Sequence, residues 1–436
     1  MSISDIFPYF CMVLHIRIKT IVKTKYTDHY THTLPCGLRI ICAPGATDVA
    51  YCGIAIDAGT RDELDTESGM AHFAEHLSFK GTKRRKSWHI INRMESVGGD
   101  LNAFTGKEET VYYCTCLKSH LPRAIDVLAD IVLNSTYPQS EMDKEVEVVA
   151  GEIESYNDSP SELIYDEFEN LLFKGHPLGR SILGKADRLR QYTTDDVQHY
   201  ARRLYTPKNM VLFVHGKVDP SRVIRLAEKA FAGYSSDNTA EDTAGTRTPL
   251  PLFLPQTVEM DMDTHQAHVM MGRRTYGATH PRHTAMFVLN HILGGPGMNS
   301  RLCQSLREKN GLVYTVESTL TTYTDTGVWA IYFGCEPSKV QRCRKLVLKE
   351  LERLTAAPLT PTALAAVKKQ IKGQVGISYD NFENVAIGMA KRFLHYNKTL
   401  TPKQLCARID ALTAEELWQT ACEMFDPQQL TQLTFR

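Results

Sequence analysis

The chain has 436 residues, of which 43% are hydrophobic and 23% are charged, a composition typical of a globular protein with two to four domains. Its 50 basic and 50 acidic residues cancel, and no basic run with interleaved aromatic residues occurs, so neither nucleic acid nor a membrane is expected as a partner. Eleven scattered cysteines favour free thiols in a reducing compartment over a disulfide framework.

The first 26 residues are interpreted as a leader of uncertain order. Its apolar stretch, 7–16, is about ten residues long, which is too short to span a bilayer. Positive charges follow this stretch at Arg17 and Lys19, whereas an export signal carries them before its apolar region. A cytoplasmic location is therefore expected.

The apolar patterns that follow predict a first domain over residues 27–234. A hairpin at 32–42 turns at the Pro-Cys-Gly of residues 35–37. In chain order, the next predicted elements are a strand at 50–58, helices at 70–79 and 87–97, strands at 101–105 and 110–117, helices at 120–133, 140–157, 160–172 and 194–204, and a strand at 210–215.

Residues 235–248 contain no large apolar side chain and are rich in Ser, Thr, Asp and Gly, which indicates an interdomain linker. The pattern of strands and helices then repeats over residues 249–436. A repeat of roughly 200 residues is typical of domain duplication rather than of a solenoid. We therefore predict an α+β fold of two tandem homologous domains, each with helices packed on a mixed or antiparallel sheet.

The strongest chemical signal is an H-x-x-E-H motif formed by His72, Glu75 and His76 in a predicted helix. A helix turns about 100° per residue, so both imidazoles can reach one ion and the carboxylate stays on the same face. Zinc binds two histidines and a carboxylate well and keeps a position for water. The motif itself is a recognised zinc-peptidase signature.

A second acidic helix is predicted at 140–157, where Glu145 and Glu152 are seven residues apart and share a face. One carboxylate could bind a metal while the other orients a ligand. By itself such a run more often marks a solvated acidic face. The H-x-x-E-H motif upstream favours the metal-binding interpretation.

The segments GMAHFAEHLSFKGT at 69–82 and DKEVEVVAGEIESYNDSP at 143–160 resemble the pitrilysin and mitochondrial-processing-peptidase family of zinc metallopeptidases, in its short, two-domain form. The resemblance extends over nearly all of the chain after about residue 27. It implies one Zn²⁺ per chain, with His72, His76 and Glu152 as ligands, Glu75 as general base and Glu145 as an auxiliary catalytic group.

Two further segments resemble this family. GGDLNAFTGKEET at 98–110 is similar to its edge strand, which implies that Leu101, Asn102, Ala103 and Phe104 pair with the backbone of the substrate. The segment 294–318 is similar to one in its second domain, which implies that Arg307 and Tyr314 complete the active site from across a cleft.

The second half contains a degraded copy of the motif. Phe287, Asn290 and His291 occupy the places of His72, Glu75 and His76, and Gln374 stands near the equivalent acidic helix. The second domain is therefore predicted to hold no zinc.

The predicted function is that of a zinc-dependent endopeptidase that hydrolyses extended peptides inside a closed chamber. The alternative is a non-catalytic partner or assembly subunit, although such a subunit has no need for all seven catalytic and metal-binding residues. The family's chambers contain four such domains, so a homodimer or a heterodimer with a related chain is expected.

Overall fold

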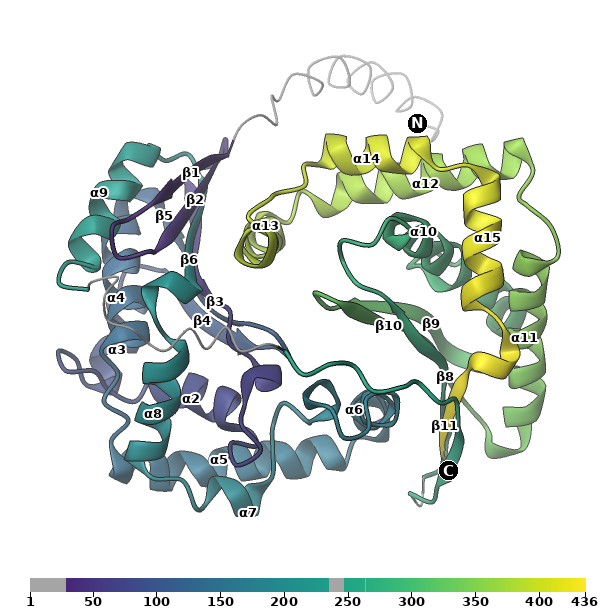
Figure 1. The fold of residues 1–436 in the computed structure, drawn as a ribbon, viewed down its shortest axis with the longest axis horizontal. Helices are drawn as coiled ribbons and strands as arrows, with labels where there is room; N and C mark the ends of the chain where they lie inside the picture. The colour runs from purple at the N-terminus through teal and green to yellow at the C-terminus, as the bar shows by residue number, and fades with distance from the viewer. Residues whose placement is uncertain (1–28, 235–246, 263) are drawn as a thin grey trace, which may run out of the picture.

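The computed structural model describes residues 29–234, 247–262 and 264–436. The predicted leader at 1–26 and residues 235–246 of the predicted linker lie outside this part. Two sheets, each with its own helices, face each other across the molecule (Figure 1). The predicted α+β class with two halves of similar architecture is confirmed. We refer to the part with the N-terminal sheet as the first half and to the other as the second half.

The first half contains a six-stranded sheet with the strand order β1-β2-β6-β3-β5-β4. Only β2 and β6 pair in parallel, so the sheet is mixed. Strand β4 forms one edge, where its backbone has a neighbour on only one side. The strands are β1 (Tyr30–Thr33), β2 (Arg39–Pro44), β3 (Val49–Ile56), β4 (Asp100–Thr105), β5 (Thr110–Leu117) and β6 (Met210–Gly216).

Helices of the first half pack on one face of this sheet and beyond its β4 edge (Figure 1). Helix α4 buries an apolar face against β3 and β5, and α2 contacts both β4 and α5. The helices are α2 (Met70–Ser78), α3 (Ser87–Glu95), α4 (Leu121–Leu133), α5 (Gln139–Asn157), α6 (Pro160–Leu172), α7 (Ala186–Leu189), α8 (Thr194–Leu204) and α9 (Pro220–Ala230).

The second half contains a five-stranded sheet with the order β7-β11-β8-β10-β9. It is also mixed, because β11 and β7 pair in parallel. Its strands are β7 (Thr257–Met260), β8 (Ala267–Tyr276), β9 (Val313–Thr322), β10 (Thr326–Cys335) and β11 (Thr431–Phe435). Its helices are α10 (His283–Gly294), a π-helical turn (Cys303–Glu308), α11 (Val340–Thr355), α12 (Pro361–Ser378), α13 (Phe382–Tyr396), α14 (Pro402–Ala411) and α15 (Ala414–Met424).

Each half lends one helix to the sheet of the other. Helix α13 of the second half lies against β6 and β3, and α6 of the first half lies against β8 and β11 (Figure 1). This exchange explains why β6 and β10 are buried along their whole length. Successive residues of a strand point to opposite faces, so a strand covered on both sides is buried at every position and is mostly apolar.

The two faces of β6 illustrate the pattern. Leu212 and Val214 pack into the core of the first half, whereas Val211 and Phe213 pack against α13. In β10, likewise, Trp329 points to the helices of its own half while Ala330 points towards α6.

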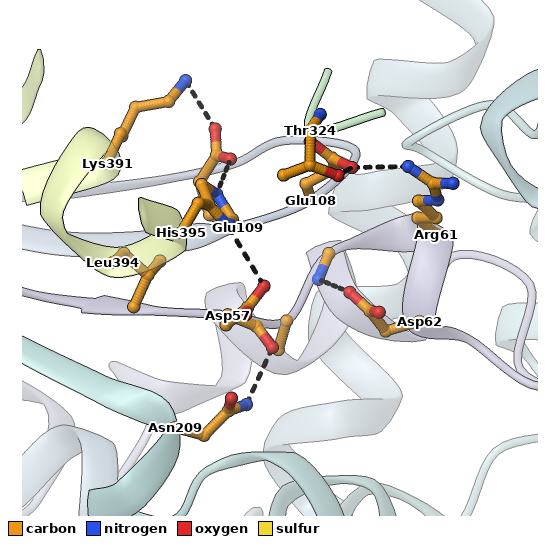
Figure 2. A network of polar contacts seen from close by, with 12 residues as sticks. Asp57, Arg61, Asp62, Glu108, Glu109, Asn209, Thr324, Lys391, Leu394 and His395 are labelled. Carbon is orange, nitrogen blue, oxygen red and sulfur yellow. Dashed lines mark hydrogen bonds and ion pairs between the residues drawn. The ribbon is translucent and has the colours of Figure 1, made fainter. Parts of the chain in front are cut away.

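A buried polar network also joins the halves, and Figure 2 shows the part of it around Asp57, Glu108 and Glu109. Arg61 pairs with Glu108 at 2.6 Å and with Asp325 of the second half at 2.6 Å, and its side chain is only 1% exposed. On α13, His395 lies 3.4 Å from Asp57 and 3.1 Å from Glu109. Charged groups buried this deeply need paired partners, so the network fixes how the halves meet.

Among the described residues, every cysteine is free, as the scattered spacing predicts. No helix in the same part of the chain is long and apolar enough to cross a membrane.

Candidate active site

Helix α2 is held in place at its first turn by backbone geometry and by a buried carboxylate. Gly69 precedes the helix with φ of 79°, a conformation that favours glycine, and an added Cβ would lie 2.8 Å from the backbone of Leu183 and Gly184. The side chain of Glu63 accepts hydrogen bonds from the amides of Gly69 and Ala71. These amides have no partner within the helix, so Glu63 caps it.

The two histidines of α2 and one glutamate of α5 converge. Nε2 of His72 lies 4.0 Å from Oε2 of Glu152, and Nε2 of His76 lies 3.6 Å from the same oxygen. One ligand atom from each residue lies within 4.8 Å of the other two, and in the described part of the chain no other group of this kind occurs. Two imidazoles and a carboxylate around one point form a donor set that fits Zn²⁺.

The protonation state of His72 agrees with this fit. Burial, together with the neighbouring His76, lowers the pKa of His72 to about 4, so its imidazole is neutral and can donate a lone pair. Burial also lowers the pKa of His76, but the hydrogen bond with Glu145 and the charge of Glu152 outweigh it and raise the pKa overall. Without a cation, His76 therefore binds a proton more tightly than an ordinary histidine does.

Glu145 orients the ring of His76 through the nitrogen that does not face Glu152. Nδ1 of His76 is hydrogen-bonded to Oε1 of Glu145 at 2.9 Å, and because a carboxylate only accepts, Nδ1 carries the proton and Nε2 is left free to bind a metal. The other carboxylate oxygen of Glu145 pairs with Lys80 at 2.5 Å. Burial raises the pKa of Glu145, but His76 and Lys80 outweigh burial and lower the pKa overall, so the group stays ionised.

Glu75 lies on the same helix and is 8% exposed. Its Oε2 accepts a hydrogen bond of 2.6 Å from the hydroxyl of Thr105, the last residue of β4. Burial is the main cause that raises the pKa of Glu75, and the Thr105 hydrogen bond works against it. The hydrogen bond ties the carboxylate to the edge strand.

The sequence motif did not reveal Thr105, Lys80 or Glu63 as parts of the site. Thr105 lies 30 residues from Glu75 along the chain, and Lys80 faces a carboxylate on another helix. Neither partner follows from local spacing. Lys80 lies two residues beyond the end of α2, and only its closeness to His76 in the sequence could have suggested that it lies near the site.

The four residues predicted to bind substrate lie on the edge strand. Leu101, Asn102, Ala103 and Phe104 are all in β4, whose free edge follows from the strand order. Strand β4 contacts α2, and Thr105 connects it to Glu75. The strand edge and the histidine pair therefore belong to one region.

Arg307 and Tyr314 are placed differently. Arg307 lies in the π-helical turn and Tyr314 near the start of β9, with the guanidinium 5.8 Å from the centre of the phenol ring. Tyr314 is 85% exposed. In the described part of the chain, neither side chain has a hydrogen bond or ion pair with the histidine site. The structure brings these two residues together but does not bring them to His72 and His76.

The second-half counterpart of the site is built on α10 and α12. Nε2 of His291 is hydrogen-bonded to the side-chain oxygen of Gln374. Asn290 accepts a hydrogen bond of 2.6 Å from Ser318, and the ring of Phe287 packs beside His291. The one imidazole is therefore already engaged with a neutral amide.

Two histidines and a carboxylate converging on one point, with a further buried carboxylate alongside, is the arrangement that zinc-dependent hydrolases use. Comparison with known proteins identifies the family. The sequence profile described as insulinase (peptidase family M16) matches residues 40–186, and the profile described as the peptidase M16 inactive domain matches residues 191–371. The chain belongs to peptidase family M16.

Curated relatives agree with this assignment. An uncharacterized zinc protease of Streptomyces coelicolor is 34% identical over 409 residues, which cover 92% of this chain and 88% of that relative. The mitochondrial-processing peptidase subunit beta of Bos taurus is 32% identical over 388 residues, which cover 87% of this chain and 78% of that protein. The chain is thus similar to zinc proteases and to a processing-peptidase subunit.

The fold is shared with solved structures. A protease from Helicobacter pylori superposes with a TM-score of 0.85 at 24% identity and covers 94% of this chain and 99% of its own. This similarity extends over both halves, so the two-sheet arrangement is a property of the fold.

Proposed function

We propose that this chain is a zinc-dependent endopeptidase that holds Zn²⁺ with His72, His76 and Glu152. The observation that carries the proposal is the convergence of three donor atoms within 4.8 Å of one another beside the buried carboxylate of Glu75. The names of the relatives support zinc and proteolysis.

The bound zinc would supply a Lewis acid that acidifies water and polarises the carbonyl of the substrate. In the proposed mechanism, Glu75 accepts the proton of the attacking water and later delivers it to the leaving amine. The hydrogen bond from Thr105 fixes one oxygen of Glu75 and leaves the other for the proton. Glu145 and Lys80 hold the tautomer and ring orientation of His76.

The free edge of β4 suggests how the peptide is presented. An extended peptide that pairs with Leu101–Phe104 would add a strand to the sheet and lie beside Glu75 and the histidines. Such pairing depends on main-chain hydrogen bonds, so we expect loose preferences for the side chains of the substrate.

The second half is proposed to complete the site when a peptide is bound. A guanidinium and a phenol can donate hydrogen bonds to the oxyanion that forms during hydrolysis, the role we assign to Arg307 and Tyr314. Both side chains are exposed and can contact a substrate, although Arg307 also pairs with its neighbour Glu308 at 3.3 Å. Closure of the halves around the peptide would then bring them to the reaction and exclude water.

We further propose that the chain works as a dimer, with itself or with a related chain, to form a closed chamber. The relative named as subunit beta supports a pairing of this kind. The competing proposal of a non-catalytic subunit draws on the match to a profile described as inactive, but that match begins at residue 191, after the complete histidine and glutamate set.

The test combines elemental analysis with digestion of unrelated peptides. Protein purified without added metal should contain about one zinc per chain and cleave the peptides, and a chelator should abolish cleavage until zinc is returned. Cleavage that persists without metal, or no zinc uptake when zinc is supplied, would contradict the proposal.

A further inference from the structure

A cavity of about 400 Å³ lies where the two halves meet, away from the histidine site. The first half contributes Pro44, at the end of β2, and His215 of β6, and the second half contributes α13 and the loop that follows it. The volume lies in the range of about 300–1,000 Å³ that is typical of small-molecule sites. Nothing in the proposed peptidase mechanism uses this cavity.

Most of the exposed area of the cavity wall is apolar, and His215 and Arg392 are two of the polar side chains that interrupt it. His215 is 7% exposed, its ring stacks on Phe382 at 5.3 Å, and its Nδ1 is buried without a hydrogen-bond partner in the described part of the chain. Burial lowers the pKa of His215, so the ring is neutral. A buried polar atom without a partner costs free energy unless something else satisfies it.

Arg392 of α13 supplies a positive charge to the same cavity. Its Nε is buried and unbonded, and among the described residues no carboxylate pairs with it; its contact is with the ring of Tyr396, 5.9 Å away. None of the residues that line the cavity is acidic. Burial and the nearby Arg408 both lower the pKa of Arg392, which is what a partly desolvated cation without a counter-charge shows.

From these observations we propose that the cavity binds a small carboxylic acid with an apolar body, such as a medium-chain fatty acid. The carboxylate pairs with Arg392, and the hydrocarbon lies against Phe382 and Pro44. An anion fits because Arg392 has no carboxylate partner among the described residues, and an apolar body fits because most of the exposed area of the wall is apolar.

The position of the cavity gives binding a structural consequence. Helix α13 belongs to the second half but packs on β6 and β3 of the first, so a ligand between α13 and the end of β6 contacts both halves at once. Binding to the folded state alone stabilises it by mass action. The ligand therefore strengthens the junction of the halves, and this effect needs no zinc.

The experiment is calorimetric titration of the full chain with octanoate and with octanamide, which has the same shape but no charge. Octanoate is expected to bind at one site per chain and about 10–100-fold more tightly than octanamide, because hydrogen bonds to charged groups are the stronger kind. The affinity should be the same with zinc and with a chelator, so a failure of the peptidase proposal leaves this result unchanged.

Three variants complete the design. Arg392→Gln should remove the preference for octanoate, whereas Lys398→Gln, which removes an exposed charge that does not line the cavity, should retain it. Gly388→Phe fills space on α13 where an added Cβ meets no heavy atom within 4 Å, and should block binding. Equal binding of the two ligands, no binding to the full chain, or equal effects of the Arg392 and Lys398 variants would overturn the proposal.

Discussion

The helix pair α2 and α5 in the first half and the helix pair α10 and α12 in the second half occupy equivalent places but have different chemistry. In the first pair, His72, His76 and Glu152 direct three donor atoms at one point. In the second pair, His291, which takes the place of His76, is bonded to the neutral side chain of Gln374. The fold alone therefore does not create a metal site.

The difference shows how few side chains distinguish a helix pair that can bind a metal from one that cannot. A carboxylate in the first half corresponds to an amide in the second, and a histidine corresponds to Phe287, whose ring packs beside His291. The amide of Gln374 and the imidazole of His291 satisfy each other by a hydrogen bond within the protein. Two imidazoles and a carboxylate, in contrast, form a donor set that a cation completes. The predictions below test each part of this contrast.

The largest effect is expected from Glu75→Gln. Glutamine keeps the shape of the side chain and can still accept the hydrogen bond from Thr105, but it cannot accept the proton of water. Peptide hydrolysis should fall by at least about 10²–10⁴-fold while zinc remains bound. Steady-state kinetics with elemental analysis will measure both, and loss of the metal would instead make Glu75 a ligand.

The contribution of the second half can be tested with Tyr314→Phe. Because Tyr314 is exposed, removal of its hydroxyl should leave folding and zinc content unchanged. If the phenol stabilises the oxyanion, the turnover number should fall by about 10²–10³-fold. Wild-type rates in this variant and in Arg307→Ala would mean that the second half only encloses the substrate.

The register of the metal ligands on α5 is tested by a matched pair, Glu152→Gln and Glu154→Gln. Mutation of a group that only orients a ligand typically weakens metal binding by about 10–100-fold. Glu152→Gln removes a ligand itself, so it should weaken zinc binding by more than that. Glu154 is two residues further along the helix, about 200° round its axis, and its replacement should have little effect. Competition with a chelator measures both affinities, and equal losses would argue against this register.

The smallest effect concerns the junction of the halves. Burial lowers the pKa of His395, but Asp57 and Glu109 outweigh it and raise the pKa to about 9, compared with about 6.5 in an unfolded chain. The protonated ring therefore stabilises the folded state fully below about pH 6.5, and this contribution disappears as the pH rises to about 9.

His395→Asn should accordingly lower the free energy of unfolding by about 2–3 kcal/mol at pH 6 and by much less above pH 9. Denaturant titrations at several pH values measure the difference, provided that both proteins unfold in one transition. A deficit that does not change with pH would show that packing, rather than the charge, is what the histidine contributes.

The sequence was most informative where the signal was local. Helix α2 and strand β5 appear within a residue of the predicted bounds, because 3.6-residue and two-residue apolar periods need only neighbouring residues. The exchange of α6 and α13 could not be predicted in the same way. Their apolar faces indicate burial but do not say which sheet they cover.

What the sequence by itself determined is the candidate metal-binding motif: the spacing of His72, Glu75 and His76 on one helical turn fixes their common face before any tertiary contact forms. What only the tertiary structure decided is the surroundings of these residues. Thr105, Lys80 and His395 acquire their partners from elements distant in the chain, because hydrogen bonds and ion pairs depend on distances in space that local periodicity does not encode.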